Sequence, residues 1–100
     1  MAKGYLIANI EVTDPAVFDQ YRSRVAPVIA AHGGTYLLRG PEIRNLEGAI
    51  GLKRLVVLEF PSLAAAEAFY RSDDYRPLLE LRKRSTRSDV ALVEGYTPPA

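Results

Sequence analysis

Hydrophobic residues alternate with polar ones in some segments of the chain and recur every third or fourth residue in others. The alternation over Gly4–Val12 predicts a strand that is buried on one face. Leu52–Phe60 predicts a second long strand, and its centre is apolar without alternation, as in strands that are buried on both faces. Apolar runs at Thr35–Arg39 and Asp89–Tyr96 complete the set of predicted strands.

Helical spacing fills the segments between these strands. A first helix is expected over residues 14–32, where Asp14 can accept hydrogen bonds from the free backbone N–H groups of the first turn. Pro27 lies inside this segment and predicts a kink or a split of the last turns. Helices are also expected over Ser62–Arg71 and Asp74–Arg84, each preceded by hydroxyl or acidic residues that suit a helix start.

The predicted order of elements is strand, helix, strand, strand, helix, strand, with the second helical region in two parts. Short connections and right-handed crossovers favour an α+β, ferredoxin-like βαββαβ fold, in which a four-stranded antiparallel sheet carries its helices on one face. One hundred residues make a single domain, residues 1–100, with a core at about 4–96. Because Leu52–Phe60 is apolar on both faces, we expect a second copy of the chain to cover the other face in a homodimer.

Composition narrows the classes of function. Thirteen basic and twelve acidic residues give a net charge of +1, which argues against a nucleic-acid partner. No apolar run approaches the ~20 residues that cross a bilayer, so no membrane partner is expected. The chain has no cysteine and no signal sequence, which favours a reducing compartment, and we expect a cytoplasmic protein.

The sequence also lacks the patterns that hold cofactors. It has no phosphate-binding loop, no nucleophile elbow and no glycine-rich dinucleotide fingerprint. With one histidine, no cysteine and no carboxylates at ligand spacing, it offers no typical metal site. We therefore expect no cofactor and no metal.

A spaced pattern of residues covers almost the whole chain, from about residue 5 to 94. Its members are Tyr21, His32-Gly33-Gly34, Tyr36, Arg39-Gly40, Leu46-Glu47-Gly48, Glu59-Phe60-Pro61-Ser62, Ala66, Tyr70, Ser72, Tyr75 and Arg82. In this pattern the chain resembles the family known as domain of unknown function 1330. The resemblance implies a dimeric α/β barrel, in which two ferredoxin-like sheets pack together. That superfamily holds cofactor-free monooxygenases, muconolactone-type isomerases and stress-induced binding proteins, so the resemblance implies a fold and a dimer but no single activity.

Glu59 and His32 are the candidate catalytic residues. Glu59 stands between apolar neighbours at the end of a central strand, where partial desolvation would suit a general base. The alternative is that Glu59 accepts hydrogen bonds from an arginine or from the helix start at Ser62. His32 ends the apolar stripe of the first helix, where it either transfers protons or interacts with the negative end of the helix dipole.

Arginines and tyrosines on inner faces are the candidate substrate-binding groups. Arg39 and Arg82 could each bind a carboxylate with two parallel hydrogen bonds, or could pair with Glu59 or Glu47 within the protein. Three tyrosines on sheet-facing helix sides would form a pocket for an aromatic molecule if they converge, or could each have a structural partner. We expect one cleft between sheet and helices, open near the Gly40–Gly51 loop, to hold Glu59, His32, Arg39, Tyr21, Tyr70, Tyr75 and Arg82.

Three functions follow from this set. The first is a cofactor-free oxygenase or isomerase acting on an acidic, conjugated small molecule, with Arg and Tyr groups stabilising an enolate. The second is a non-catalytic binding or stress-response module that uses the same cleft. The third is a structural dimer unit, which would need no polar residues on its inner faces.

Overall fold

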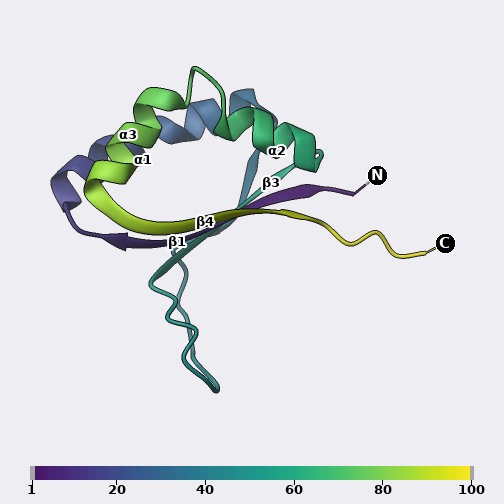
Figure 1. Cartoon of the computed structure of the whole chain (residues 1–100), viewed down its shortest axis with the longest axis horizontal. Coiled ribbons are helices and arrows are strands. Elements are labelled where there is room, and N and C mark those ends of the chain that lie inside the picture. The colour runs from purple at the N-terminus through teal and green to yellow at the C-terminus, as the bar shows by residue number, and fades with distance from the viewer. Residues whose placement is uncertain (1, 100) are drawn as a thin grey trace.

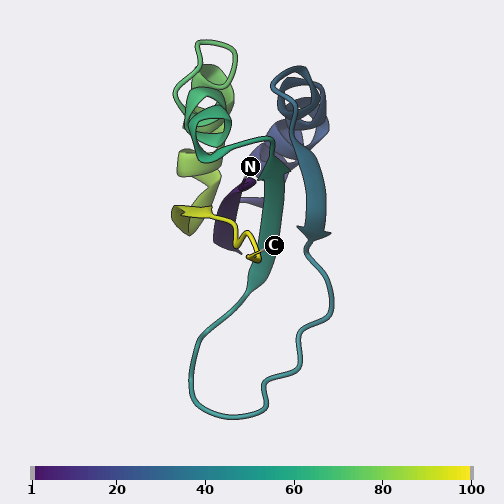
Figure 2. The same ribbon diagram turned by 90° about the vertical axis from the view of Figure 1, so that its right-hand side faces the viewer.

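The computed structural model describes residues 2–99 and has the predicted ferredoxin-like order (Figure 1). The four strands form one antiparallel sheet in the order β2-β3-β1-β4. The helices lie together over one face of this sheet, as the two views of the ribbon show (Figures 1 and 2). In chain order the elements are β1 (Gly4–Val12), α1 (Pro15–Ala31), β2 (Thr35–Arg39), β3 (Arg54–Phe60), α2 (Leu63–Tyr70), α3 (Arg76–Ser85) and β4 (Thr86–Glu94).

The start of α1 follows the predicted capping chemistry, but its end does not follow the predicted break. The Asp14 carboxylate accepts a hydrogen bond from the Val17 backbone N–H at 3.3 Å. The helix then runs without a split through Pro27 to Ala31. Pro27 is exposed, so the carbonyl that loses its partner to the proline ring faces solvent, where water can satisfy it.

The junction between α3 and β4 also differs from the predicted boundaries. β4 begins at Thr86 rather than Asp89, because the backbone N–H of Thr13 donates to the carbonyl of Ser85 at 2.7 Å and holds the junction against β1. The Ser85 hydroxyl is buried and donates to the Leu81 carbonyl at 2.7 Å. The residues at this junction are polar and do not alternate with apolar ones, so the alternation did not predict the first residues of the strand.

The hydrophobic core lies between the sheet and the helices. Alternate residues of β1 and β3 point into it and meet the inner faces of α1, α2 and α3. Its fully buried members include Phe60 and Phe69, whose rings pack 5.2 Å apart. The other buried apolar residues are Leu6, Ala8, Ile10, Phe18, Val25, Ile29, Leu58, Ala66, Tyr75 and Leu78.

The opposite face of the sheet has no helix over it. Its apolar side chains include Ile7, Leu38 and Val93, with exposed fractions of 36%, 38% and 42%. We call this surface the open sheet face. Residues 40–53 form a long loop that extends away from the helices beyond the ends of β2 and β3 (Figures 1 and 2).

Candidate functional site

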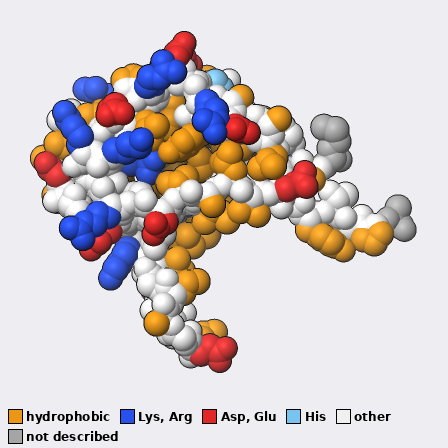
Figure 3. Space-filling model, in the orientation of Figure 1, with side chains coloured by type: hydrophobic (Ala, Val, Ile, Leu, Met, Phe, Trp, Pro, Cys, Tyr) orange, Lys and Arg blue, Asp and Glu red, His pale blue; other side chains and the backbone are white. Residues whose placement is uncertain are grey.

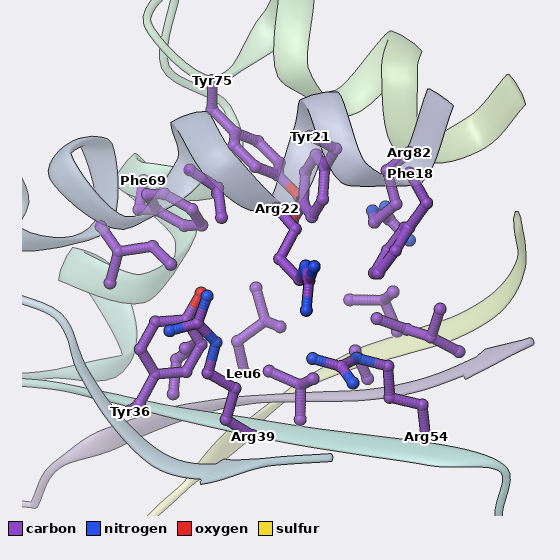
Figure 4. Close-up of a pocket in the computed structure, with 17 residues that line it drawn as sticks. Leu6, Phe18, Tyr21, Arg22, Tyr36, Arg39, Arg54, Phe69, Tyr75 and Arg82 are labelled. Atoms are coloured by element: carbon purple, nitrogen blue, oxygen red, sulfur yellow. Dashed lines mark hydrogen bonds between the residues drawn. The ribbon is translucent and has the colours of Figure 1, made fainter. Parts of the chain in front are cut away.

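A cavity lies between the sheet and the helices, beside the hydrophobic core (Figure 4). The space open to the centres of water-sized molecules is about 30 Å³, enough for a few waters. A larger ligand must therefore displace side chains at the mouth. The polar and aromatic residues that line the cavity are Phe18, Tyr21, Arg22, Tyr36, Arg39, Arg54, Phe69, Tyr75 and Arg82, and the remaining lining is aliphatic.

Arg82 is the buried charge of this site. It projects from the inner side of α3 and is only 4% exposed. Its Nη2 donates a long hydrogen bond of 3.5 Å to the Tyr70 hydroxyl, while its Nε has no hydrogen-bond partner. Within residues 2–99 it forms no salt bridge to an Asp or Glu. A guanidinium buried without a counter-charge is costly, and an anion bound beside Arg82 would offset this cost.

Two tyrosines form a hydroxyl pair in the roof of the cavity. Tyr21 comes from α1 and Tyr75 immediately precedes α3, and their hydroxyl oxygens lie 3.0 Å apart (Figure 4). Burial raises the pKa of Tyr21, the neighbouring Tyr75 raises it further, and the charge of Arg82 opposes them. The Tyr21 phenol therefore stays protonated. One hydroxyl donates to the other, which leaves one O–H of the pair for an acceptor in the cavity.

A β-bulge in β2 brings Arg39 to the cavity. Tyr36 pairs with Leu58, but Leu38 pairs with Val57 and Arg39 with Val56, so the register shifts after Tyr36. The extra residue reverses the alternation of the strand, and both Tyr36 and Arg39 then lie on the helix-facing side. Burial raises the pKa of the Tyr36 phenol, while the charges of Arg39 and Arg54 oppose this shift.

Sequence reasoning missed two arginines of the site. Arg54 lies at the start of β3, half-buried, with its guanidinium 5.7 Å from the centre of the Phe18 ring. Arg54 lies two residues before the inward-facing Val56 in the same strand, and this spacing predicts that Arg54 also faces inward. Arg22 is exposed on α1 and forms a salt bridge of 3.1 Å with Asp19. Among the described residues, no Asp, Glu or His lines the cavity, so the site is cationic.

The arginines follow a gradient of exposure from the interior of the cavity to its mouth. Arg82 is buried, Arg54 is half-buried, and Arg39 and Arg22 are exposed. On the side of the molecule that carries α3 and β4, the space-filling view shows further Lys and Arg side chains beside apolar side chains between the helices and the sheet (Figure 3). Positive charge at the mouth attracts an anion toward the buried Arg82.

The expectation of one cleft for all seven candidate residues needs correction, because the cavity lining includes only Tyr21, Arg39, Tyr75 and Arg82. Glu59 alternates with the buried Leu58 and therefore lies on the open sheet face, where its carboxylate accepts a hydrogen bond from the Tyr5 hydroxyl at 3.3 Å. Burial, followed by the charge and hydrogen bond of Glu59, raises the pKa of Tyr5.

His32 and Tyr70 also lie outside the cavity. His32 caps the C-terminus of α1, with its Nε2 3.5 Å from the Asp74 carboxylate and its ring edge against Phe69. Tyr70 lines a shallower hollow between α3 and β4, which it shares with Arg82. None of the residues of the 40–53 loop lines the cavity, so in this conformation the loop does not cover the site.

Replacing Arg82 by Met is expected to raise the stability of the ligand-free protein by about 1–2 kcal/mol, because an unpaired buried charge gives way to an apolar side chain of similar length. Urea unfolding at a fixed protomer concentration measures the change. Arg84→Met is the matched control, since Arg84 is exposed on the same helix and should stay within ~0.5 kcal/mol of the wild type. A marked loss of stability in Arg82→Met would mean that the charge has a structural partner.

The order of the elements and of the strands in the sheet is that of a ferredoxin-like α+β fold. The chain belongs to the family described as Domain of unknown function (DUF1330), whose model matches residues 3–96. Within residues 2–99, no helix has the length and apolar character needed to cross a membrane.

Two solved structures show the same fold. The chain is similar to the RPA0582 protein of unknown function from Rhodopseudomonas palustris, with 17% identity, a TM-score of 0.75, and coverage of 97% of this chain and 85% of that one. It is also similar to SnoaB, a cofactor-independent oxygenase from Streptomyces nogalater, with 14% identity, a TM-score of 0.66, and coverage of 98% and 97%. No curated protein matches the sequence.

Proposed function

We propose that this protein binds a small aromatic or conjugated anion in the cavity between its sheet and its helices. The observation that carries the proposal is Arg82, a buried guanidinium without a carboxylate partner in the described chain. An anionic group of the ligand accepts hydrogen bonds from this guanidinium and from the free O–H of the Tyr21–Tyr75 pair. Such charge-assisted hydrogen bonds are the strongest that a protein offers to a carboxylate or an enolate.

The aromatic lining supports a planar ligand body. Tyr21, Tyr36, Phe18, Phe69 and Tyr75 all contribute to the cavity wall. Aromatic side chains present flat apolar faces and polar edges, which favour stacked or edge-to-face contact with another conjugated ring. The combination of a flat apolar wall with cationic groups is typical of sites that select charged aromatic molecules over aliphatic ones.

The homodimer is part of the same proposal. The open sheet face carries the exposed Ile7, Leu38 and Val93, and a second copy packed against it would remove this apolar surface from water. The likeness in fold to the dimeric α/β-barrel proteins supports this arrangement. The absence of cysteine is consistent with a cytoplasmic location, which we retain as part of the proposal.

Cofactor-free oxygenation is the second candidate function. It is favoured by the cationic cavity, because arginines stabilise the deprotonated, electron-rich form of a conjugated substrate, the form that reacts with O₂. The likeness in fold to SnoaB is consistent with this chemistry. Glu59 and His32 lie outside the cavity, so the substrate would ionise through its own acidity and the charge of the arginines. An oxygenase would consume O₂ and the ligand together, whereas a binding protein would consume neither.

Replacing Arg82 by Gln tests the binding function. We expect the affinity for naphthalene-2-carboxylate to fall by about 30-fold, or ~2 kcal/mol, because the carboxylate loses its buried charged donor. Isothermal titration calorimetry measures the change, and Arg84→Gln, on the exposed side of α3, should leave the affinity unaltered. Equal affinities of the wild type for the carboxylate and for neutral naphthalene-2-carboxamide would contradict the proposal.

A further inference from the structure

A second group of positive charge lies on the sheet side of the cavity, across from Arg82. Arg39 of β2 is directly opposite Val56 of β3, two residues from Arg54 in the same strand. Arg39 and Arg54 are therefore diagonal neighbours on the helix-facing side of the sheet, and both line the cavity. Diagonal neighbours on adjacent strands have Cα atoms ~7–8 Å apart, so the long side chains of two such arginines can reach one group in the cavity.

Neither arginine has a counter-charge in the described chain. Arg39 and Arg54 form no salt bridge within residues 2–99, and the Nε of Arg54 is buried without a hydrogen-bond partner. The Arg39 guanidinium lies 4.8 Å from the centre of the Tyr36 ring, and Arg54 lies similarly over Phe18. Contact with an aromatic face leaves the in-plane N–H groups of a guanidinium free to donate to an anion.

The close-up shows how these groups are arranged. Arg54 extends from the sheet toward the centre of the cavity and Arg39 rises from the sheet beside Tyr36, whereas Arg82 and the tyrosine pair approach from the helices (Figure 4). The cavity thus has one cationic group at its helical wall and a second at its sheet wall. Apolar and aromatic side chains lie between them.

The number of unpaired arginines in the cavity lining also favours a ligand with two negative charges. Four arginines line the cavity and, within residues 2–99, only Arg22 has a carboxylate partner, Asp19, although the whole chain has a net charge of just +1. A ligand with one negative charge at Arg82 would leave Arg39 and Arg54 unpaired beside each other. A second anionic group that both side chains reach would pair both charges.

We propose that the ligand is a conjugated dianion, with one anionic group at Arg82 and the Tyr21–Tyr75 hydroxyls and a second at Arg39 and Arg54. This inference rests on the proposed function, because it extends the same cavity site from one anionic group to two. The class of ligand is an aromatic dicarboxylate, or an aromatic carboxylate that carries a second acidic enol or phenol.

Matched probes test the second group directly. Naphthalene-2-carboxylate and naphthalene-2,6-dicarboxylate share one ring system and differ in one negative charge, and 6-carbamoylnaphthalene-2-carboxylate controls for the size of the added group. We expect the dicarboxylate to bind the wild-type protein at least ~10-fold more tightly than the other two probes by calorimetry. The advantage should shrink at high salt, since part of it is electrostatic.

Variants then identify the residues that bind the second anionic group. In the double variant Arg39→Gln/Arg54→Gln, the advantage of the dicarboxylate should disappear, because the affinity for the dicarboxylate falls by a larger factor than the affinity for the monocarboxylate. Arg22→Gln is the matched control at the mouth, because Arg22 already has Asp19 as its partner, and this variant should retain the advantage. In ¹⁵N NMR spectra, the dicarboxylate should shift the Nε–H signals of Arg39, Arg54 and Arg82, and the monocarboxylate mainly that of Arg82.

The outcomes separate this inference from the function on which it rests. Equal affinity of the wild type for the mono- and dicarboxylate would overturn the dianion and leave the anion-binding function intact. An equal loss of affinity for both probes in the double variant would also overturn it, because the two arginines would then act only as general positive charge. Failure of both probes to bind would overturn the proposed function and the inference together.

Discussion

Replacing Val57 by Glu is expected to convert the proposed homodimer into monomers at low micromolar concentration. Val57 lies near the centre of the open sheet face, where it pairs with Ile7 of β1 and alternates with the inward-facing Val56 and Leu58. A carboxylate buried there without a partner costs several kcal/mol, and ~4 kcal/mol raises a dissociation constant about 1,000-fold. Sedimentation velocity of the wild type and the variant at equal concentration measures the change.

The control for this experiment carries the same charge on the other side of the molecule. Ala68 is exposed on α2, on the solvent side of the helical layer, so Ala68→Glu should remain dimeric. Circular dichroism should show that both variants keep their secondary structure. A dimeric Val57→Glu variant, or a wild type that is monomeric at this concentration, would contradict an interface on the open sheet face.

Replacing Gly4 by Ala is expected to destabilise the fold by about 3 kcal/mol and to lower the melting temperature by roughly 10–20 °C. Gly4 is buried at the start of β1, where the chain passes directly under the start of α2. A Cβ atom at this position would overlap the Ser62 carbonyl oxygen and would lie 2.5 Å from the Leu63 Cα. Both neighbours are backbone atoms, so β1 and α2 must move apart to make room.

Gly48→Ala provides the comparison for this stability measurement. Gly48 has a φ of +75° but no neighbouring atom within 4 Å, so alanine there meets only the backbone strain of the left-handed region. That strain amounts to ~1 kcal/mol. Denaturant unfolding at matched protomer concentration should rank the variants clearly, and a Gly4→Ala variant that costs no more than Gly48→Ala would show that the contact at α2 relaxes freely.

Most of the fold could be predicted because most of its helices and strands have sequence signals within their own residues. The alternation of β1 and the capping residue Asp14 act through neighbouring residues alone, and both predictions are confirmed. The start of β4 could not be predicted from neighbouring residues. Thr86 becomes part of the strand because the neighbouring Ser85 carbonyl is bound by Thr13 from a distant part of the chain, and no local pattern records that contact.

The cavity was harder to predict than the fold. Its lining depends on which face of a strand or helix each side chain occupies, and the residue type alone does not reveal this. Glu59 is a carboxylate beside apolar neighbours, but the two-residue period of β3 places it on the open sheet face. Arg39 is on the cavity side only because the bulge in β2 reverses its direction, and a bulge has no dependable sequence signal when no glycine marks it. Arg82 was predicted, since it follows the inner stripe of α3 with Leu78 and Tyr75.

The strand order has a consequence for the halves of the chain on either side of the long loop. Residues before the loop supply β1 and β2, and residues after it supply β3 and β4, yet the sheet order is β2-β3-β1-β4. Every ladder of the sheet therefore joins one half to the other, and no two strands of the same half are neighbours. A protease cut between Arg44 and Asn45 would leave two fragments that can complete a native sheet only by recombining, so the loop is the natural point at which to divide this protein into complementing parts.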